Sequence, residues 1–144
     1  MLVVDAACVV EIVIRGKMVE EVEARLAQDP VFAAPEIIDV EVLGVVRREL
    51  VRGVLDETAA FLAAQSLREW TGIRFGHRPF IERVWELRHN VGTKDAFYIA
   101  LAEALELTLV TLDGRLSRAP GIRCDIEVLT SPYPRRCASM LPPA

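Results

Sequence analysis

The sequence has few cysteines and no long hydrophobic segment. Its 144 residues include three cysteines, an odd number, and none of them forms a C-x-x-C pair. This pattern argues against a disulfide framework and against a cysteine zinc site, and free thiols suit a reducing compartment. The apolar N-terminal segment is interrupted by Asp5 and Glu11 and has no basic residues before it. We therefore expect a cytoplasmic protein without a signal peptide or a membrane span.

Motifs of several common enzyme classes are also missing. The sequence contains no G-x-S-x-G, no G-x-x-x-x-G-K-[ST] and no G-x-G-x-x-G, which argues against a serine hydrolase, a P-loop nucleotidase and a dinucleotide-binding enzyme. Its two histidines, His77 and His89, lie in loop-like segments, and we predict that they are exposed rather than catalytic. Cys8 is predicted to lie in the core. Trp70 and Trp85 are interpreted as packing residues, with an interface role left open for one of them.

The composition is that of one folded domain. Hydrophobic residues make up 52% of the chain and charged residues 26%, values typical of a globular protein that can bury a core. The net charge is −4, with acidic residues in excess in the first half of the chain and basic residues in the second. This charge neither supports nor excludes an RNA substrate, and it is equally compatible with a basic protein partner.

Short apolar runs alternate with longer helical patterns. The predicted strands are 2–5, 31–34, 71–75, 107–112 and 126–129, and the predicted helices are 6–14, 18–27, 35–52, 56–69, 79–88 and 94–105. Pro35 suits the first position of its helix, and Thr93 is expected to cap the last helix. The alternation predicts an α/β fold with a mainly parallel sheet of roughly five strands. We place this domain at residues 1–130 and treat the proline-rich segment 131–144 as a tail.

Two acidic residues occupy positions where parallel α/β proteins bind ligands, and a third lies at the start of a helix. Asp5 and Asp113 follow two predicted strands, and ligands gather outside the carboxyl ends of such strands. An aspartate after a strand is also common in simple turns, which is the alternative for both residues. Asp95 lies in the first turn of its predicted helix, where the helix dipole alone favours a carboxylate.

Glu41 is unusual because its neighbours three and four positions away on the predicted helix are all apolar or glycine. A carboxylate in such surroundings costs desolvation energy unless another group pairs with it. Arg48, two helical turns further on, is one possible partner; a functional role in a site is the other interpretation.

Together the four carboxylates favour a metal site. Carboxylates at one sheet edge repel each other and take up protons unless a cation neutralises them. Oxygen ligands select hard cations such as Mg²⁺ or Mn²⁺, which serve phosphodiester hydrolysis by activating water. A phospho-receiver also places acids at strand ends, but it needs a lysine after a later strand. The only lysines, Lys17 and Lys94, do not follow a predicted strand.

The four acids lie in four longer segments: VVDAA at 3–7, PEIIDVEVLGVVRREL at 35–50, LRHNVGTKDAFYIALAEAL at 87–105 and LVTLDGRL at 109–116. These segments resemble the PIN domain, and more narrowly the VapC toxins of bacterial toxin–antitoxin pairs. The resemblance runs from residue 2 to about residue 130 and implies a three-layer α/β/α sandwich with a mainly parallel sheet. It also implies that Asp5 and Asp95 bind Mg²⁺, and that Glu41 and Asp113 complete the site or act through water. Thr111 matches the family hydroxyl two residues before the last acid.

The resemblance further implies a metal-dependent endoribonuclease that cleaves RNA such as tRNA or rRNA. Such a toxin forms a homodimer, is inhibited by a small antitoxin and contacts operator DNA only through that antitoxin. Lys94 and Arg115 are candidates for contacts to phosphate. One position departs from the family: Ala7 stands where Ser or Thr is common, which removes a hydroxyl and predicts weaker metal binding. Ala7 also leaves open a weakly active or inactive PIN-fold protein that acts with its antitoxin as a DNA-binding transcriptional regulator.

Overall fold

Five short strands form a single parallel sheet. The computed structural model describes residues 1–132. Its strands are β1 (Leu2–Val4), β2 (Phe32–Pro35), β3 (Ile73–Phe75), β4 (Leu109–Thr111) and β5 (Ile126–Val128). They are ordered β3-β2-β1-β4-β5, and every neighbouring pair is parallel. The predicted five-stranded parallel sheet is therefore confirmed.

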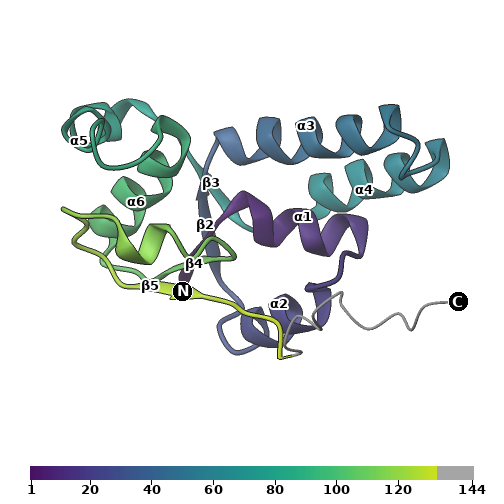
Figure 1. Cartoon of the computed structure of the whole chain (residues 1–144), viewed down its shortest axis with the longest axis horizontal. Coiled ribbons are helices and arrows are strands. Elements are labelled where there is room, and N and C mark those ends of the chain that lie inside the picture. Colours follow the sequence, from purple (N-terminus) through teal and green to yellow (C-terminus); the bar gives the residue numbers. More distant parts are fainter. Residues whose placement is uncertain (133–144) are drawn as a thin grey trace, which may run out of the picture.

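Helices cover both faces of this sheet. They are α1 (Ala6–Ile14), α2 (Val19–Leu26), α3 (Ile37–Val51), α4 (Glu57–Glu69), α5 (Ile81–Glu86) and α6 (Thr93–Leu105), with two 3₁₀ helices at Arg78–Phe80 and Leu116–Arg118. Figure 1 shows α5 and α6 on one side of the sheet and α1, α3 and α4 on the other. This arrangement confirms the predicted three-layer sandwich.

The core is centred on β1 and β4, the two strands that precede Asp5 and Asp113. Val3, Val4 and Val110 are completely buried, because helices cover both faces of these strands. Strands covered on both faces consist of continuous apolar runs rather than an alternating pattern. From α6, Tyr98 and Leu101 are also buried in this core. Helix α6 contacts both β1 and β2, so its first turn has a fixed position relative to the sheet.

Two helix starts differ from the prediction. Pro35 is the last residue of β2 and pairs with Phe75 of β3, and α3 begins only at Ile37. A proline is tolerated at the end of a strand, where its missing N–H breaks few ladder bonds. Thr93 is the first residue of α6 rather than its cap, and Gly92 holds the cap position without a side-chain hydrogen bond.

Two further expectations concern the C-terminal tail and a membrane span. Most of the predicted tail, including Cys137, lies outside the described residues. Among residues 1–132, no helix is both long and apolar enough to cross a membrane.

Candidate active site

The four predicted acids line one cleft of about 810 Å³ at the carboxyl ends of the strands. Asp5 directly follows β1, and Asp113 lies two residues after β4. Because β1 and β4 are hydrogen-bonded neighbours, these two segments leave the sheet side by side. Glu41 reaches the cleft from α3 and Asp95 from the first turn of α6. The fold thus brings together residues from four separate segments of the chain.

A chain of hydrogen bonds links the two strand ends. The Thr111 hydroxyl donates to Asp5 Oδ2 at 2.6 Å. The same hydroxyl oxygen accepts the backbone N–H of Asp113 at 3.0 Å. Thr111 is completely buried and the side chain of Asp5 is nearly so, so both are held rigidly. The polar groups here need these partners, since a buried unpaired hydroxyl or carboxylate is costly.

Glu41 is paired, but not with the arginine considered from the sequence. The Tyr98 hydroxyl donates to Glu41 Oε1 at 3.1 Å, and Lys94 Nζ lies 3.9 Å from Oε2. Arg48 instead forms an ion pair with Glu49, although it also lines the cleft. The sequence analysis missed Tyr98; its place three residues after Asp95, on the same face of α6, was the available clue.

Asp113 fits both interpretations made from the sequence. Its carboxylate accepts the backbone N–H of Arg115 at 2.9 Å, which is an Asx turn, and pairs with the Arg115 guanidinium at 2.8 Å. Arg115 therefore lowers the pKa of Asp113. The side chain also lines the cleft. Asp113 is thus a turn residue, ion-paired with Arg115, that also lies at the edge of the cleft.

The other three acids have raised pKa values. Burial raises the pKa of Asp5, and nearby Asp95 and Asp113 raise it further, against the hydrogen bond from Thr111. Burial raises the pKa of Glu41 and of Asp95, and other cleft carboxylates add to both shifts. Within residues 1–132, neither Asp5 nor Asp95 forms an ion pair with a lysine or arginine. The cleft therefore concentrates negative charge that lacks a full counter-charge.

The chemistry of these donors suits a hard divalent cation. Across residues 1–132, no three His, Cys, Asp or Glu side chains form a complete metal site. Mg²⁺ does not require such a site, because it keeps several waters and is usually bound by one or two carboxylates plus substrate phosphates. Asp5 and Asp95 meet that requirement with oxygen donors alone. Ala7 also lines the cleft and offers only a methyl group there.

Comparison with known proteins decides the family. The PIN domain family matches residues 2–122. The chain belongs to the PIN domain family. Two relatives from Mycobacterium tuberculosis are named Ribonuclease VapC1 and Ribonuclease VapC12. The first is 40% identical over 129 residues, covering 88% of this chain and 96% of the relative. The second is 33% identical over 129 residues, covering 90% and 99%.

A solved structure shares the fold of this PIN domain. It is described as VapBC2 from Rickettsia felis bound to a DNA fragment from their promoter. The two chains superpose with a TM-score of 0.62 at 17% identity, over 90% of this chain and 98% of the other. At that identity the match is evidence for the fold.

Neither histidine of this PIN domain lines the acidic cleft. His89 is exposed, as predicted. The exposure predicted for His77 is wrong, because this side chain is half-buried: its Nε2 accepts the backbone N–H of Ile37 at 3.1 Å, and its ring contacts Phe97. His77 therefore satisfies a free N–H at the start of α3.

The cysteine and tryptophan predictions have mixed outcomes. Cys8 is completely buried in the core, as predicted. Trp70 is a packing residue that stacks on Phe32. The packing interpretation is wrong for Trp85, which is 68% exposed. The interface role that was left open for one tryptophan stays a prediction, with Trp85 as the exposed candidate.

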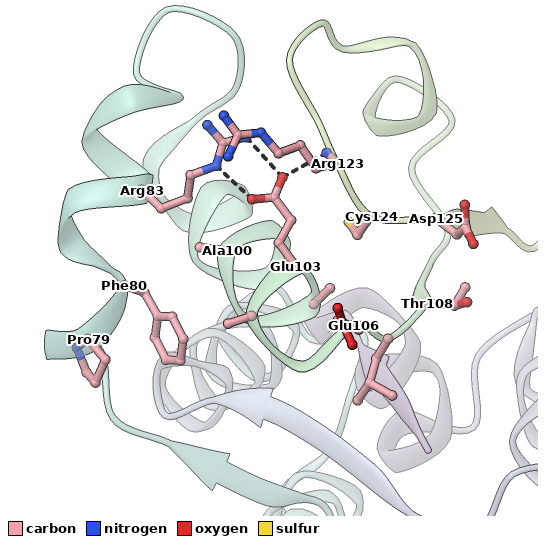
Figure 2. A pocket seen from close by; sticks show the side chains of 13 residues that line it. Pro79, Phe80, Arg83, Ala100, Glu103, Glu106, Thr108, Arg123, Cys124 and Asp125 are labelled. Atoms are coloured by element: carbon pink, nitrogen blue, oxygen red, sulfur yellow. Dashed lines mark hydrogen bonds and ion pairs between the residues drawn. The ribbon is translucent and has the colours of Figure 1, made fainter.

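The PIN domain has a second cavity, of about 750 Å³, at the opposite edge of the sheet. Thr108 and Asp125, which line it, immediately precede β4 and β5. Figure 2 shows Arg83 and Arg123 converging on the carboxylate of Glu103. The Arg83 Nε donates to Glu103 at 2.7 Å, and the backbone N–H of Arg123 donates at 2.8 Å. The buried charge of this cavity is paired within the protein.

Proposed function

We propose that this PIN domain is a Mg²⁺- or Mn²⁺-dependent endoribonuclease, the toxin of a VapBC-like toxin–antitoxin pair. The observation that carries the proposal is the group of three carboxylates with raised pKa values, Asp5, Glu41 and Asp95, on one cleft. The names of the relatives support the same reaction, because they are called ribonucleases.

Each acid has a distinct role in this proposal. Asp5 and Asp95 would hold the cation, since neither forms an ion pair with a lysine or arginine among the described residues. Glu41 and Asp113 orient water at the edge of the site, and the lowered pKa of Asp113 keeps it ionised. A bound Mg²⁺ or Mn²⁺ supplies water activation and neutralises charge on the phosphate and the leaving oxygen.

Basic side chains at the rim of the cleft suit an RNA substrate. Arg48, Lys94 and Arg115 line the cleft around its acidic floor. They are exposed, and each forms an ion pair with a carboxylate that a phosphate of a long polyanion crossing the cleft would replace. Contacts of this kind position the nucleic acid without reading its sequence. A structured RNA such as tRNA or rRNA is the proposed substrate.

Exposed apolar side chains on the helices beside the cleft support a protein partner. Val40 and Leu43 on α3 and Phe61 and Leu62 on α4 are between 45% and 70% exposed, and Val40 also lines the cleft. Such surfaces are typical of interaction sites. We assign them to the antitoxin and to a second copy of this chain, with operator DNA contacted only through the antitoxin. Light scattering on the chain alone and on the co-expressed complex tests both assignments.

The test of the proposed function is cleavage of purified tRNA and rRNA. The wild-type chain is expected to cleave with Mg²⁺ or Mn²⁺ and to stop when the metal is chelated. Asp95→Asn is expected to be inactive. Asp125→Asn is the matched control, because Asp125 is an exposed acid on the opposite cavity. Cleavage by Asp95→Asn at the wild-type rate contradicts the proposal.

The RNA cleavage assay, together with an operator DNA binding assay, distinguishes the ribonuclease from the alternative function. A wild-type chain that leaves RNA intact, in a complex with its antitoxin that binds operator DNA, supports the transcriptional regulator instead. The absence of a hydroxyl at Ala7, on the wall of the cleft, is the feature that motivates this comparison.

A further inference from the structure

We propose that Tyr98 is a positioning residue that fixes the carboxylate of Glu41, so that this carboxylate can hold the water of a cation bound in the cleft. This inference rests on the proposed metal-dependent function. The proposed mechanism does not use one contact in this cleft: the hydroxyl of a core tyrosine donates to Glu41 Oε1 at 3.1 Å.

The Tyr98 side chain places a polar hydroxyl in the apolar core. The side chain is only 1% exposed and is the largest of the fully buried side chains. A phenylalanine would fill nearly the same volume without a polar atom, whereas a buried hydroxyl costs free energy unless it is hydrogen-bonded. The partner that the structure gives this hydroxyl is Glu41. Packing therefore accounts for the ring, and Glu41 accounts for the hydroxyl.

Tyr98 is also better suited than Lys94 to hold Glu41. Lys94 Nζ lies 3.9 Å from Oε2, and its side chain is 66% exposed. An exposed lysine at that distance is a weak and mobile partner. The ring of Tyr98 is fixed by the core instead, so its hydroxyl defines one position for Oε1.

Helix α6 links this contact to the rest of the site. Tyr98 lies three residues after Asp95, so both side chains project from the same face of the helix. The same helix therefore places one carboxylate of the cleft directly and a second one through the tyrosine hydroxyl. Hydrogen bonds to metal-site groups from residues outside the ligand set typically change metal affinity about 10- to 100-fold.

The test measures Mn²⁺ affinity from the electron paramagnetic resonance signal of free Mn²⁺. Tyr98→Phe is expected to bind Mn²⁺ about tenfold more weakly than wild type. In a Glu41→Gln background the same substitution is expected to have no further effect. Thr108→Val is the matched control, since it removes a hydroxyl at the opposite edge of the sheet, and it should bind Mn²⁺ normally. Thermal unfolding of each variant separates lost affinity from lost folding.

Three outcomes overturn the inference. The first is that Tyr98→Phe binds Mn²⁺ as tightly as wild type. The second is that Tyr98→Phe lowers Mn²⁺ affinity by the same factor with and without Glu41→Gln. In both cases the proposed ribonuclease is unaffected. A wild-type chain that binds no Mn²⁺ overturns the metal-dependent function as well, which distinguishes the two failures.

A second measurement needs no substitution of Tyr98. The chain has two tyrosines, so 3-fluorotyrosine labelling gives two ¹⁹F signals, and Tyr133→Phe assigns them. On titration with diamagnetic Mg²⁺, the Tyr98 signal is expected to shift with the midpoint of metal binding. A Tyr98 signal that stays constant through saturation contradicts the inference, even if Tyr98→Phe fails to fold.

Discussion

Buried carboxylates are paired with arginine in one cavity of this domain and left without a full counter-charge in the other. At the amino ends of the strands, burial raises the pKa of Glu103. The hydrogen bonds and positive charges of Arg83 and Arg123 together outweigh burial, so the pKa is lowered overall. At the carboxyl ends, burial and neighbouring carboxylates raise the pKa values of Asp5, Glu41 and Asp95. The first arrangement completes its charge balance within the chain. The second has an excess of negative charge that a bound cation can neutralise, which is typical of a functional site.

The topology explains why the excess lies at one edge. In a parallel sheet all carboxyl ends meet at the same edge, where loops lead into helices. Asp5 and Asp113 follow adjacent strands there. At the other edge, Glu103 lies near the end of α6, where arginines from two other segments reach it.

Asp5→Asn should abolish the function of the acidic cleft without harming the fold. RNA cleavage is expected to fall more than about a hundredfold, because a metal-binding carboxylate is lost. The free energy of unfolding should stay the same or rise, since the substitution removes a charge whose burial is unfavourable. Single-turnover cleavage and urea unfolding measure the two effects. An Asp5→Asn variant that cleaves RNA within threefold of wild type contradicts the role of this cleft.

Glu103→Gln should have the reverse pattern. It leaves the Arg83 guanidinium without its main partner, and both side chains are largely buried. The expected loss is about 2 kcal/mol of unfolding free energy, with unchanged RNA cleavage per folded molecule. Glu106→Gln, an exposed acid on the same cavity, should change neither quantity. A cleavage defect in Glu103→Gln at temperatures where it is folded would mean that the second cavity is also functional.

The pH dependence of stability should differ in sign between the cavities. Because the pKa of Asp95 is raised in the folded state, its contribution is fully present below its unfolded pKa and is lost as pH rises through the folded pKa. The lowered pKa of Glu103 acts the other way, so its contribution is present above its unfolded pKa and is lost as pH falls. Urea unfolding from about pH 4 to pH 7 should therefore show Asp95→Asn gaining stability relative to wild type as pH rises. Saturating Mg²⁺ should reduce that difference, and a difference that is independent of pH contradicts the raised pKa.

Ala7→Ser should strengthen the cation site. The serine hydroxyl offers one more hydrogen bond to metal-bound water in the cleft, worth about 0.5 to 1.5 kcal/mol. Mn²⁺ affinity is therefore expected to rise about two- to thirteenfold, again measured by the signal of free Mn²⁺. Ala104→Ser, on the second cavity, is the matched control and should have no effect. Unchanged affinity in Ala7→Ser would show that position 7 does not contact the hydration shell.

The sequence predicted some features of the site better than others. Asp5 and Asp113 could be selected because both follow apolar strands, and Glu41 because its surroundings on the helix are apolar. The partner of Glu41 could not be selected in the same way. Arg48 is close in sequence, whereas Tyr98 comes from a helix 57 residues away. Sequence spacing can suggest partners only on the same helix. Which donor from a distant segment lies next to the Glu41 carboxylate depends on tertiary packing.

The dependence on tertiary packing also explains two predictions about local structure that were wrong. Pro35 is a good first residue for a helix, but its pairing with β3 extends β2 by one position. The environment of Trp85 also depends on which face of α5 meets α6, and periodicity over a six-residue helix does not determine that.

By itself, the sequence determined the order of strands and helices, the parallel sheet and the identity of the four acids. These depend on local patterns: continuous apolar runs, helical periodicity and acidic residues after strands. The tertiary structure alone decided how charge is distributed between the two cavities. It paired Glu103 with Arg83, and it left Asp5 and Asp95 without an ion pair among the described residues. The physical reason is that burial and charge proximity shift pKa values only after distant segments have packed together.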